Sequence, residues 1–415
     1  MMKRNSVIIV GAGAAGCMAA VTAASRGLDV TLFDRNEKIG RKMLITGKGR
    51  CNVTNNCDRD TLMASVPVNS RFLYSAFAAF SPQDTMDFFE KNGVPLKTER
   101  GKRVFPQSDK STDIIDAFFR KLRELHVRII NEDVKELIFS DENTVCGVKT
   151  NKADYRADCV MLACGGCSYP QTGSDGFGYK LAESSGHTIV EPIPSLIPII
   201  TKESWCSDLQ GLSLRNVTLT LKNAKNKTLY SELGEMLFTH YGITGPLVLS
   251  ASSHIDIKKS SDYTLSIDLK PALTVEQLDK RVIRDLETFH NKDIINSLDE
   301  LLPKRLIPVV IKLSGIEPHK KCCEITKGER QSLVSTLKSL NVTFDGFRPI
   351  EEAIITRGGV NVREIDPKTM QSKKCRGLYF GGEIIDVNAY TGGFNLQIAF
   401  STGYLAGMSF LDNDK

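Results

Sequence analysis

Close to its start the chain reads Val7-Ile8-Ile9-Val10-Gly11-Ala12-Gly13-Ala14-Ala15-Gly16. The first four residues are β-branched and apolar, which is typical of a strand buried on both faces. The next six match G-x-G-x-x-G, the pattern of a turn that leads from a strand into a helix. Alanines continue to Ala24 and Gly27 follows them, which predicts a helix that ends there. Residues 30–33 are again β-branched and apolar, so the sequence predicts a right-handed β-α-β unit.

The glycines and one acid in this unit suit a dinucleotide. Gly11 permits the tight turn, Gly13 leaves room for a pyrophosphate, and Gly16 lets the helix pack on the strand. The acid stands at Asp34, 18 residues beyond Gly16, where it can accept hydrogen bonds from a ribose diol. A glycine-rich core without a ligand is the alternative. We predict that the dinucleotide contacts include Gly11, Gly13, Ala14, Ala15, Gly16, Asp34 and Arg35.

A second glycine-rich and cationic loop occupies residues 40–52. It is not a P-loop, because Lys42 stands where the first glycine of that motif belongs and Gly49 replaces its Ser or Thr. We interpret it as a backbone nest from which Arg50 reaches the same pyrophosphate, with a solvated basic loop as the alternative. The residues expected to contact the dinucleotide are Arg41, Lys42, Gly49, Arg50, Cys51 and Asn52.

Further along the chain the pattern alternates between helix and strand. Apolar spacing predicts amphipathic helices over 81–92 and 113–125. Three short strands, 127–130, 134–139 and 145–150, are expected to form a small antiparallel layer. A buried strand at 159–163 runs into Gly165 and Gly166.

The composition changes near Pro192. Alternating strands are expected at 217–221, 236–238 and 263–269, and helices from 275 to 337 after the N-cap Thr274. Strands at 341–344, 353–355 and 377–380 and a helix over 395–408 complete the pattern. We expect an α/β protein whose Rossmann-like domain is interrupted by a β-barrel-like and helical cap. The expected divisions are 1–192 and 348–415 for the Rossmann-like domain, 193–271 with 338–347 for the barrel, and 272–337 for the helices.

Composition restricts the function. The 415 residues contain 54 Lys and Arg against 49 Asp and Glu, a net charge of +5 without a run of five like charges, which argues against nucleic-acid and membrane-surface partners. The 11 cysteines are scattered and odd in number, as in a protein of the reducing cytoplasm. The uncharged stretch 6–25 resembles a signal peptide, but its glycines fit the nucleotide turn better. The histidines and cysteines show no metal-ligand spacing, so no metal site is expected.

Six segments together resemble the bacterial BaiN/YhiN flavoproteins, which are FAD-binding oxidoreductases of the two-dinucleotide-binding type. The resemblance covers essentially the whole chain in the same order. The segments are Gly11 to Gly16 with Asp34, residues 40–52, Ala163-Cys164-Gly165-Gly166, residues 239–246, residues 381–386 and residues 391–395.

The resemblance implies roles for individual residues. Asp34 would hold the adenosine ribose, although the family more often has Glu there. Glu383 and Asp386 resemble the second flavin signature, which delivers an acid to the ribityl chain, and Gly392 and Gly393 would bring the last helix near the pyrophosphate or the flavin carbonyl. A plain turn before the helix is the alternative. The remaining implied FAD contacts are Ala163, Gly165, Gly166, Gly382, Phe394 and Asn395.

Three residues are candidates for catalysis. His240 and Tyr241 lie in a loop flanked by glycine and proline, and histidine suits proton transfer beside hydride transfer, although a structural histidine is an equal alternative. Arg357 precedes two glycines whose N–H groups could lie over the isoalloxazine while Arg357 orients an anionic substrate. Cys164 and Cys167 have C-x-x-C spacing, but Cys164 stands where related flavoproteins carry Thr, which argues against a redox disulfide.

The resemblance favours an FAD-dependent oxidoreductase. Residues 168–176 are similar to a segment of fumarate reductases and ketosteroid dehydrogenases, which implies hydride exchange at a carbon–carbon bond. We expect an NAD(P)H-dependent reductase of an activated C=C bond in a small molecule, with steroid or bile-acid enones as candidates. Because a second G-x-G-x-x-G is absent, NAD(P)H would bind transiently. The alternatives are an aminoacetone-type amine oxidase that uses oxygen, and a flavin-binding regulatory or RNA-modification-associated protein without turnover.

Overall fold

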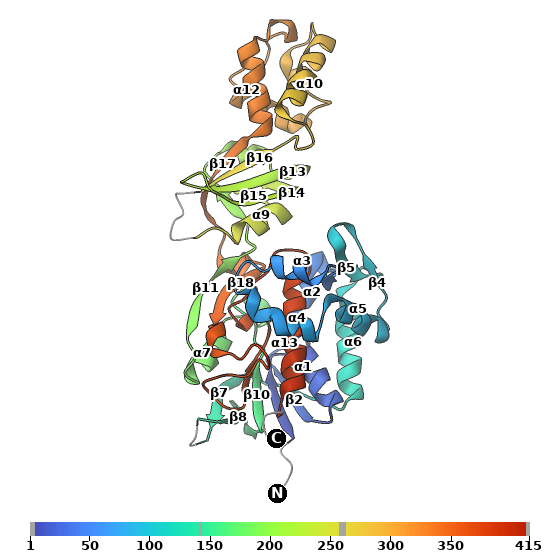
Figure 1. The fold of residues 1–415 in the computed structure, drawn as a ribbon, viewed down its shortest axis with the longest axis vertical. Helices are drawn as coiled ribbons and strands as arrows, with labels where there is room; N and C mark the ends of the chain where they lie inside the picture. The colour runs from blue at the N-terminus through green and yellow to red at the C-terminus, as the bar shows by residue number, and fades with distance from the viewer. Residues whose placement is uncertain (1–4, 141–142, 257–262, 412–415) are drawn as a thin grey trace. The chain divides into compact units, whose positions relative to one another are not determined.

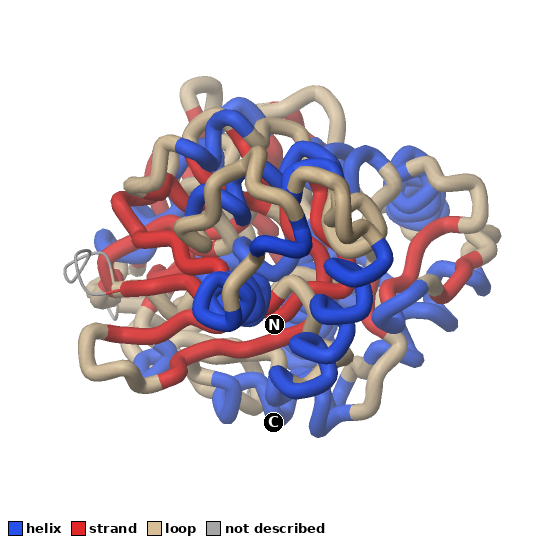
Figure 2. The backbone as a smooth tube through the Cα atoms, turned by 90° about the horizontal axis from the view of Figure 1, so that it is seen from above, coloured by secondary structure: helices blue, strands red, loops and turns tan. Residues whose placement is uncertain are grey.

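The chain divides into two compact units. The computed structural model describes residues 5–140, 143–256 and 263–411. The first unit consists of Met1–Ser195 and Pro349–Lys415, and the inserted unit is Leu196–Arg348. We had expected the divisions after residue 192 and before residue 348. Figure 2 shows the helices and strands of the backbone together with the loops that connect them.

A five-stranded parallel sheet forms the centre of the first unit (Figure 1). Val10 at the end of the first strand lies opposite Phe33 on one side and Leu162 on the other, so the carboxyl ends of three strands meet at one edge. Ligands of open parallel sheets bind at this edge. In spatial order the strands are β19 (Leu378–Phe380), β10 (Cys159–Leu162), β1 (Ser6–Val10), β2 (Asp29–Asp34) and β6 (Arg128–Asn131).

The predicted β-α-β unit and Rossmann-type sheet are confirmed, but one strand was assigned to the wrong layer. β6 pairs in parallel with β2, whereas residues 127–130 were expected in an antiparallel layer. The short β-branched run fits either sheet, because its partner lies almost 100 residues earlier in the chain. The antiparallel layer consists of β7 (Val134–Phe139), β8 (Val145–Thr150) and β9 (Asp154–Arg156).

The first and last helices of the described chain pack along each other: α1 (Ala14–Ser25) and α13 (Phe394–Ser409) (Figure 1). Gly403 and Gly407 make this approach possible, because a Cβ on Gly403 would lie 2.3 Å from the Ala15 oxygen and one on Gly407 would lie 2.8 Å from the Ala19 oxygen. The Arg26 guanidinium, just beyond the end of α1, donates to the Gly407 oxygen at 2.7 Å and so links the two helices at that end.

Smaller elements surround this sheet. A three-stranded antiparallel sheet contains β3 (Thr54–Asn55), β5 (Arg103–Pro106) and β4 (Leu96–Thr98), and β11 (Ile189–Ser195) pairs with β18 (Ile355–Val360). Residues 353–355 were predicted as a strand, but the strand begins only at Ile355 because a short turn occupies 350–352. The helices are α2 (Arg41–Ile45), α3 (Arg59–Ala64), α4 (Tyr74–Ala79), α5 (Pro82–Lys91), α6 (Ser111–Glu124) and α7 (Phe177–Ser184).

The inserted unit contains the expected barrel and helices. Its closed antiparallel barrel has the order β12 (Ile199–Thr201), β15 (Gly242–Thr244), β14 (Thr228–Thr239), β13 (Ser213–Asn223), β16 (Tyr263–Asp268) and β17 (Leu340–Phe347). Thr274 caps α10 as predicted, because its hydroxyl accepts from the Gln277 N–H at 3.2 Å and the Gln277 amide accepts in return. The helices are α8 (Trp205–Asp208), α9 (Pro246–Ser252), α10 (Val275–Thr288), α11 (Ile307–Leu313) and α12 (Lys327–Lys338). Over the described ranges, every helix is too short or too polar to cross a lipid bilayer.

A buried histidine of the first unit is held neutral by its partners. Ser372 Oγ accepts from the N–H groups of Lys374 and Cys375, so its proton points to His187 Nε2 at 2.8 Å. His187 Nδ1 then donates to Ser185 Oγ at 2.8 Å, and that hydroxyl donates to the Ala182 oxygen. Burial lowers the pKa of His187, with Lys374 acting in the same direction and Glu364 opposing it.

We therefore predict an acid-sensitive free energy of unfolding. The unfolded chain takes up a proton at His187 as the pH falls through about 6.5, while the folded chain does so only at lower pH. Stability should decline below that pH, with a contribution from this residue of at most about 1.4 kcal/mol per pH unit. Urea unfolding of wild type and His187→Gln between pH 7.5 and 5 measures it, and parallel profiles would contradict the prediction.

Candidate dinucleotide and active site

The three glycines of the β1–α1 turn have three different surroundings. Gly11 has φ +105°, and a Cβ there would lie 2.5 Å from the Ala163 oxygen. A Cβ on Gly16 would lie 1.8 Å from the Gly11 oxygen, so only glycine lets the helix start so close to the strand. A Cβ on Gly13 would meet nothing within 4 Å. The open space beside Gly13, at the start of a helix without a side-chain cap, fits the pyrophosphate of a dinucleotide.

Asp34 is held at this turn by hydrogen bonds. Its Oδ2 accepts from the Ala12 N–H at 2.7 Å, and its Oδ1 accepts from the N–H and the amide of Asn36 at 2.8 and 2.9 Å. A carboxylate offers about four acceptor positions, so Asp34 can still accept from a hydroxyl. Its position at the carboxyl end of β2 is the one that a ribose diol requires.

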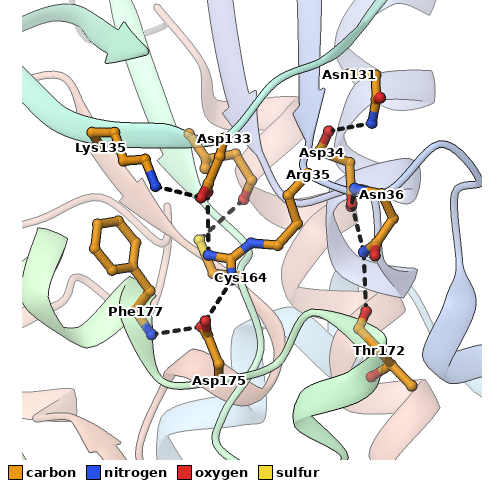
Figure 3. A network of polar contacts seen from close by, with 11 residues as sticks. Asp34, Arg35, Asn36, Asn131, Asp133, Lys135, Cys164, Thr172, Asp175 and Phe177 are labelled. Carbon is orange, nitrogen blue, oxygen red and sulfur yellow. Dashed lines mark hydrogen bonds and ion pairs between the residues drawn. The ribbon is translucent and has the colours of Figure 1, made fainter. Parts of the chain in front are cut away.

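Figure 3 shows that Arg35 joins two loops next to Asp34. Its guanidinium pairs with Asp133 at 3.2 Å and with Asp175 at 2.5 Å. Asn36 donates to the Thr172 oxygen at 3.1 Å (Figure 3). The Asn36 side-chain oxygen also accepts from Arg41 at 2.7 Å. Arg35 and Arg41 thus belong to a polar network around Asp34, and a direct contact of either with the dinucleotide stays a prediction.

Lys42 and Glu383 form an ion pair that the sequence did not indicate. Lys42 Nζ lies 2.6 Å from both Glu383 Oε2 and Ser168 Oγ. Glu383 Oε1 accepts from the Thr356 N–H at 2.8 Å and from Ser168 Oγ at 3.0 Å. Lys42 and Glu383 were each expected at the cofactor, and Ser168 and Thr356 were missed. No local pattern reveals this group, because its members lie between 126 and 341 positions from Lys42.

The loop after α2 has the unusual backbone of a nest. Gly47, Lys48, Gly49 and Cys51 all have positive φ, from 57° to 83°. Arg50, which was expected to reach the pyrophosphate, pairs with Glu99 at 2.9 Å and Asp109 at 3.1 Å and covers the Phe105 ring at 4.0 Å. These partners hold the guanidinium at the small antiparallel sheet. Burial raises the pKa of the Cys51 thiol to about 12, so this thiol stays neutral.

The N-terminus of α13 lies against the strand that follows this loop. A Cβ on Gly393, whose φ is +99°, would lie 2.3 Å from the Thr54 oxygen. Asn55 donates to the Gly392 oxygen at 3.0 Å, and the Asn52 amide oxygen accepts from the Gly393 N–H at 3.0 Å. The structure thereby brings Asn52 next to Gly392 and Gly393, three residues that were expected at one cofactor. The Asn395 side chain is used locally, because it bonds the backbone of Ala389 and Tyr390.

Gln397 anchors the first turn of α13 in a buried polar network. Its amide oxygen accepts from the hydroxyls of Thr54 at 2.6 Å and Thr85 at 2.8 Å. Its amide nitrogen donates to the Phe80 oxygen at 3.1 Å and to Ser401 Oγ at 2.9 Å. The Gln397 side chain is fully buried, so every polar atom of its amide is satisfied inside the protein.

Gln397→Leu should therefore lower the free energy of unfolding by about 2–4 kcal/mol, because the buried Thr54 hydroxyl loses its acceptor and the Thr85 hydroxyl keeps only the Ser81 oxygen at 3.3 Å. Gln83→Leu is the control, since Gln83 is exposed on α5, and it should stay within about 0.5 kcal/mol of wild type. Urea unfolding of both variants measures the difference. Equal effects in the two variants would contradict the role of the network.

The end of β10 completes this edge of the sheet. The Ala163 oxygen packs against Gly11, and Gly166 leaves no room for a Cβ, which would lie 2.5 Å from Thr356 Oγ1 and 3.0 Å from Glu383 Oε1. Cys164 and Cys167 are free thiols. Burial raises the pKa of Cys164 to about 12 and also raises the pKa of Cys167, so neither is an activated thiolate.

Asp386 and Arg357 lie together in the first unit. Asn69, which the sequence analysis missed, donates to the Asp386 backbone oxygen at 2.7 Å and to its carboxylate at 3.0 Å. Burial raises the pKa of Asp386, while Asn69 and the nearby Arg357 oppose the rise. A buried carboxyl with a raised pKa beside a guanidinium suits a site that handles protons and carbonyl oxygens.

His240 and Tyr241 occupy the turn between β14 and β15 in the inserted unit. The two rings meet edge to face at 4.8 Å, and the Arg348 guanidinium lies 4.8 Å from the Tyr241 ring. His240 is exposed, so its ring is open to a ligand. A catalytic role for His240 or Tyr241 stays a prediction.

Comparisons with known proteins agree with this fold. The profile of the HI0933-like protein Rossmann domain matches residues 5–409. The chain is 32% identical to the 3-dehydro-bile acid delta(4,6)-reductase of Clostridium scindens, over 97% of this chain and 98% of that protein. It is 31% identical to the ribosomal RNA dihydrouridine synthase of Haemophilus influenzae, over 99% of both chains.

A solved structure shows the same fold at low identity. The 3-ketosteroid delta1-dehydrogenase of Sterolibacterium denitrificans superposes with a TM-score of 0.50 at 15% identity, covering 97% of this chain and 99% of that one. The resemblance drawn from the six motifs is confirmed at full length by the profile and by the two relatives, which are both enzymes. The chain belongs to the HI0933-like family of Rossmann-type proteins.

Proposed function

We propose that the chain is an FAD-dependent oxidoreductase that reduces a C=C bond conjugated to a carbonyl group. The observation that carries the cofactor assignment is the β1–α1 turn, where Gly13 borders open space while Gly11 and Gly16 are closed by the backbone. The bonded Asp34 and the N-terminus of α13 beside residues 52–55 support the same assignment. Bound FAD would supply the hydride for the reduction.

The residues of this chain would hold the cofactor in three places. The first turn of α1 offers N–H groups for the pyrophosphate, and Asp34 offers its carboxylate to the ribose. Glu383, fixed by Lys42 and Ser168, offers an acceptor for a polyol chain. The protein must also deliver a proton, for which His240, Tyr241 and the buried Asp386 are candidates, while Arg357 would stabilise negative charge on the substrate carbonyl oxygen.

The names of the relatives support the reaction type. A delta(4,6)-reductase of a 3-dehydro bile acid saturates C=C bonds, and a dihydrouridine is a uridine with one C=C bond saturated. In the 3-dehydro bile acid and in uridine, the C=C bond that is reduced is conjugated to a carbonyl. The sequence identities to the two relatives, 32% and 31%, are too similar to favour the substrate of one relative over that of the other. Both a steroid enone and a uridine in RNA are therefore candidate substrates for this chain.

The cofactor assignment has a direct test. Purified protein should be yellow, and acid precipitation should release FAD into the supernatant, because no histidine or cysteine is recognisably placed as a covalent anchor. Flavin that stays with the precipitate, or that proves to be FMN, would contradict the assignment.

Anaerobic stopped-flow measurements test the reaction. NADH or NADPH should bleach the flavin absorbance, and a 3-oxo-Δ4,6 bile acid or a uridine-containing ribosomal RNA fragment should restore it. Bleaching by aminoacetone instead would favour the amine oxidase, and bleaching by none of the three would favour a binding protein without turnover.

A further inference from the structure

A small pocket lies in the inserted unit, and none of the residues assigned to the cofactor or to catalysis lines it. Its volume is about 200 Å³, below the roughly 300–1,000 Å³ of sites for drug-sized ligands. It lies between the barrel and the helical segment, against β13, the residues after β16 and the 302–306 turn. The Arg305 guanidinium fixes that turn to the end of α8 by donating to the oxygens of Asp208 and Gln210 at 2.7 and 2.9 Å.

The pocket combines an apolar lining with two cations. The apolar side chains that line it, Leu214, Val217, Leu269, Leu302 and Leu306, are all at most 6% exposed. The cations in the lining are Arg215, which is exposed, and Lys270, which is partly buried.

The backbone at Lys270 is firmly held. Its N–H donates to Asp268 Oδ1 at 2.8 Å, and its oxygen accepts from the Leu273 N–H at 3.1 Å and from Lys338 Nζ at 3.2 Å. Lys338 also pairs with the second oxygen of Asp268 at 2.6 Å. The nearest acid in the sequence is therefore already used by another lysine and by a backbone N–H.

The two pocket cations lack a partner in the part of the chain that the structure describes. No hydrogen bond or ion pair within those residues involves Lys270 Nζ or the Arg215 guanidinium, and Glu235, opposite Arg215 in the β13–β14 ladder, forms no ion pair with it. The charge acting on Lys270 is a further cation, Arg281, whose own partners are Asp285 and Glu300. Burial and Arg281 lower the pKa of Lys270. A partly buried charge without a counter-ion is costly, and an anion in the pocket would relieve that cost.

We propose that this pocket binds a carboxylate carried on a short hydrocarbon body. Lys270 and Arg215 pair with the carboxylate, and the leucine and valine side chains cover the hydrocarbon. An inorganic anion would make no use of the apolar side chains, and a neutral hydrocarbon would leave the two cations without a partner. The site is separate from the proposed flavin function and does not depend on it.

Calorimetric titration of the full-length chain, as purified, tests the proposal with three probes. Hexanoate has both features, 1-hexanol has only the hydrocarbon, and inorganic phosphate has only the charge. Hexanoate should bind with one site per chain and more tightly than either comparator. Lys270→Gln and Arg215→Gln should each weaken hexanoate binding about tenfold or more. Lys280→Gln, which removes an exposed positive charge from α10 outside the pocket, should bind as wild type does.

A second measurement needs no variant. After reductive methylation with ¹³C-formaldehyde, saturating hexanoate should raise the pKa of Lys270, read from its resonance, because the carboxylate favours the charged amine, and it should not move the Lys280 resonance. Equal binding of hexanol and hexanoate, equal binding of phosphate and hexanoate, or equal effects of Lys270→Gln and Lys280→Gln would each overturn the proposal. So would an unchanged Lys270 resonance.

Discussion

The variant Gly13→Val should fold normally and bind no flavin. The backbone of Gly13 has φ −81°, which any residue adopts, and a Cβ there meets no protein atom within 4 Å. The valine methyl groups would instead occupy the space that we assign to the pyrophosphate. We expect a far-ultraviolet spectrum like that of wild type and a flavin-to-protein absorbance ratio near zero.

Two further glycine variants test whether the loss of flavin is specific to Gly13. Gly16→Val should fail to fold, because its Cβ would lie 1.8 Å from the Gly11 oxygen. Gly328→Val in α12 also adds a Cβ that meets nothing within 4 Å, but it lies in the inserted unit and should keep its flavin. A folded Gly13→Val protein with a full complement of FAD would place the dinucleotide elsewhere.

His240→Ala should slow one half of the reaction by about 10²–10⁴-fold, the usual contribution of a general acid. Flavin binding should not change, because the cofactor contacts are assigned to the first unit and His240 lies in the inserted one. A proton is needed when the substrate accepts hydride, so reduction of the flavin by its electron donor should proceed at nearly the normal rate. Stopped-flow traces of the two half-reactions measure each effect separately.

The matched control is His290→Ala, which removes another exposed histidine of the inserted unit. It should leave both half-reactions unchanged. Equal slowing of both halves in His240→Ala, or loss of FAD, would make His240 a structural residue. Unaltered rates in both halves would exclude it from the site, and Asp386 would then be the stronger candidate for the proton donor.

The sequence was sufficient to predict those features whose residues lie close together in the chain. The β1–α1 turn could be foreseen because Gly11, Gly13 and Gly16 act within six positions of each other, and Asp34 follows at a fixed spacing. The capped start of α10 was foreseen for the same reason. In each case one short segment contains both the backbone conformation and the groups that satisfy it.

The sequence did not predict pairings between distant segments. Arg50 looked available for a phosphate because nothing nearby in the chain suggested Glu99 and Asp109 as partners. Lys42 and Glu383 were placed in the same cofactor site without the ion pair that joins them. Such contacts depend on how strands and loops pack in three dimensions, and charge patterning within a short window carries no information on them.

The packing of α13 along α1 has a consequence for biosynthesis. The dinucleotide turn is made among the first 16 residues, but the helix that lies against it begins only at Phe394. Between Ser195 and Ser409 the ribosome must add 214 residues, which takes roughly 10–40 s at about 5–20 residues per second. During that interval α1 lacks the surface that Gly403 and Gly407 provide, whereas the inserted unit, which is continuous in sequence, is already fully synthesised by Arg348. The order of translation therefore makes the whole inserted unit available for folding before the helix that covers α1 has been synthesised.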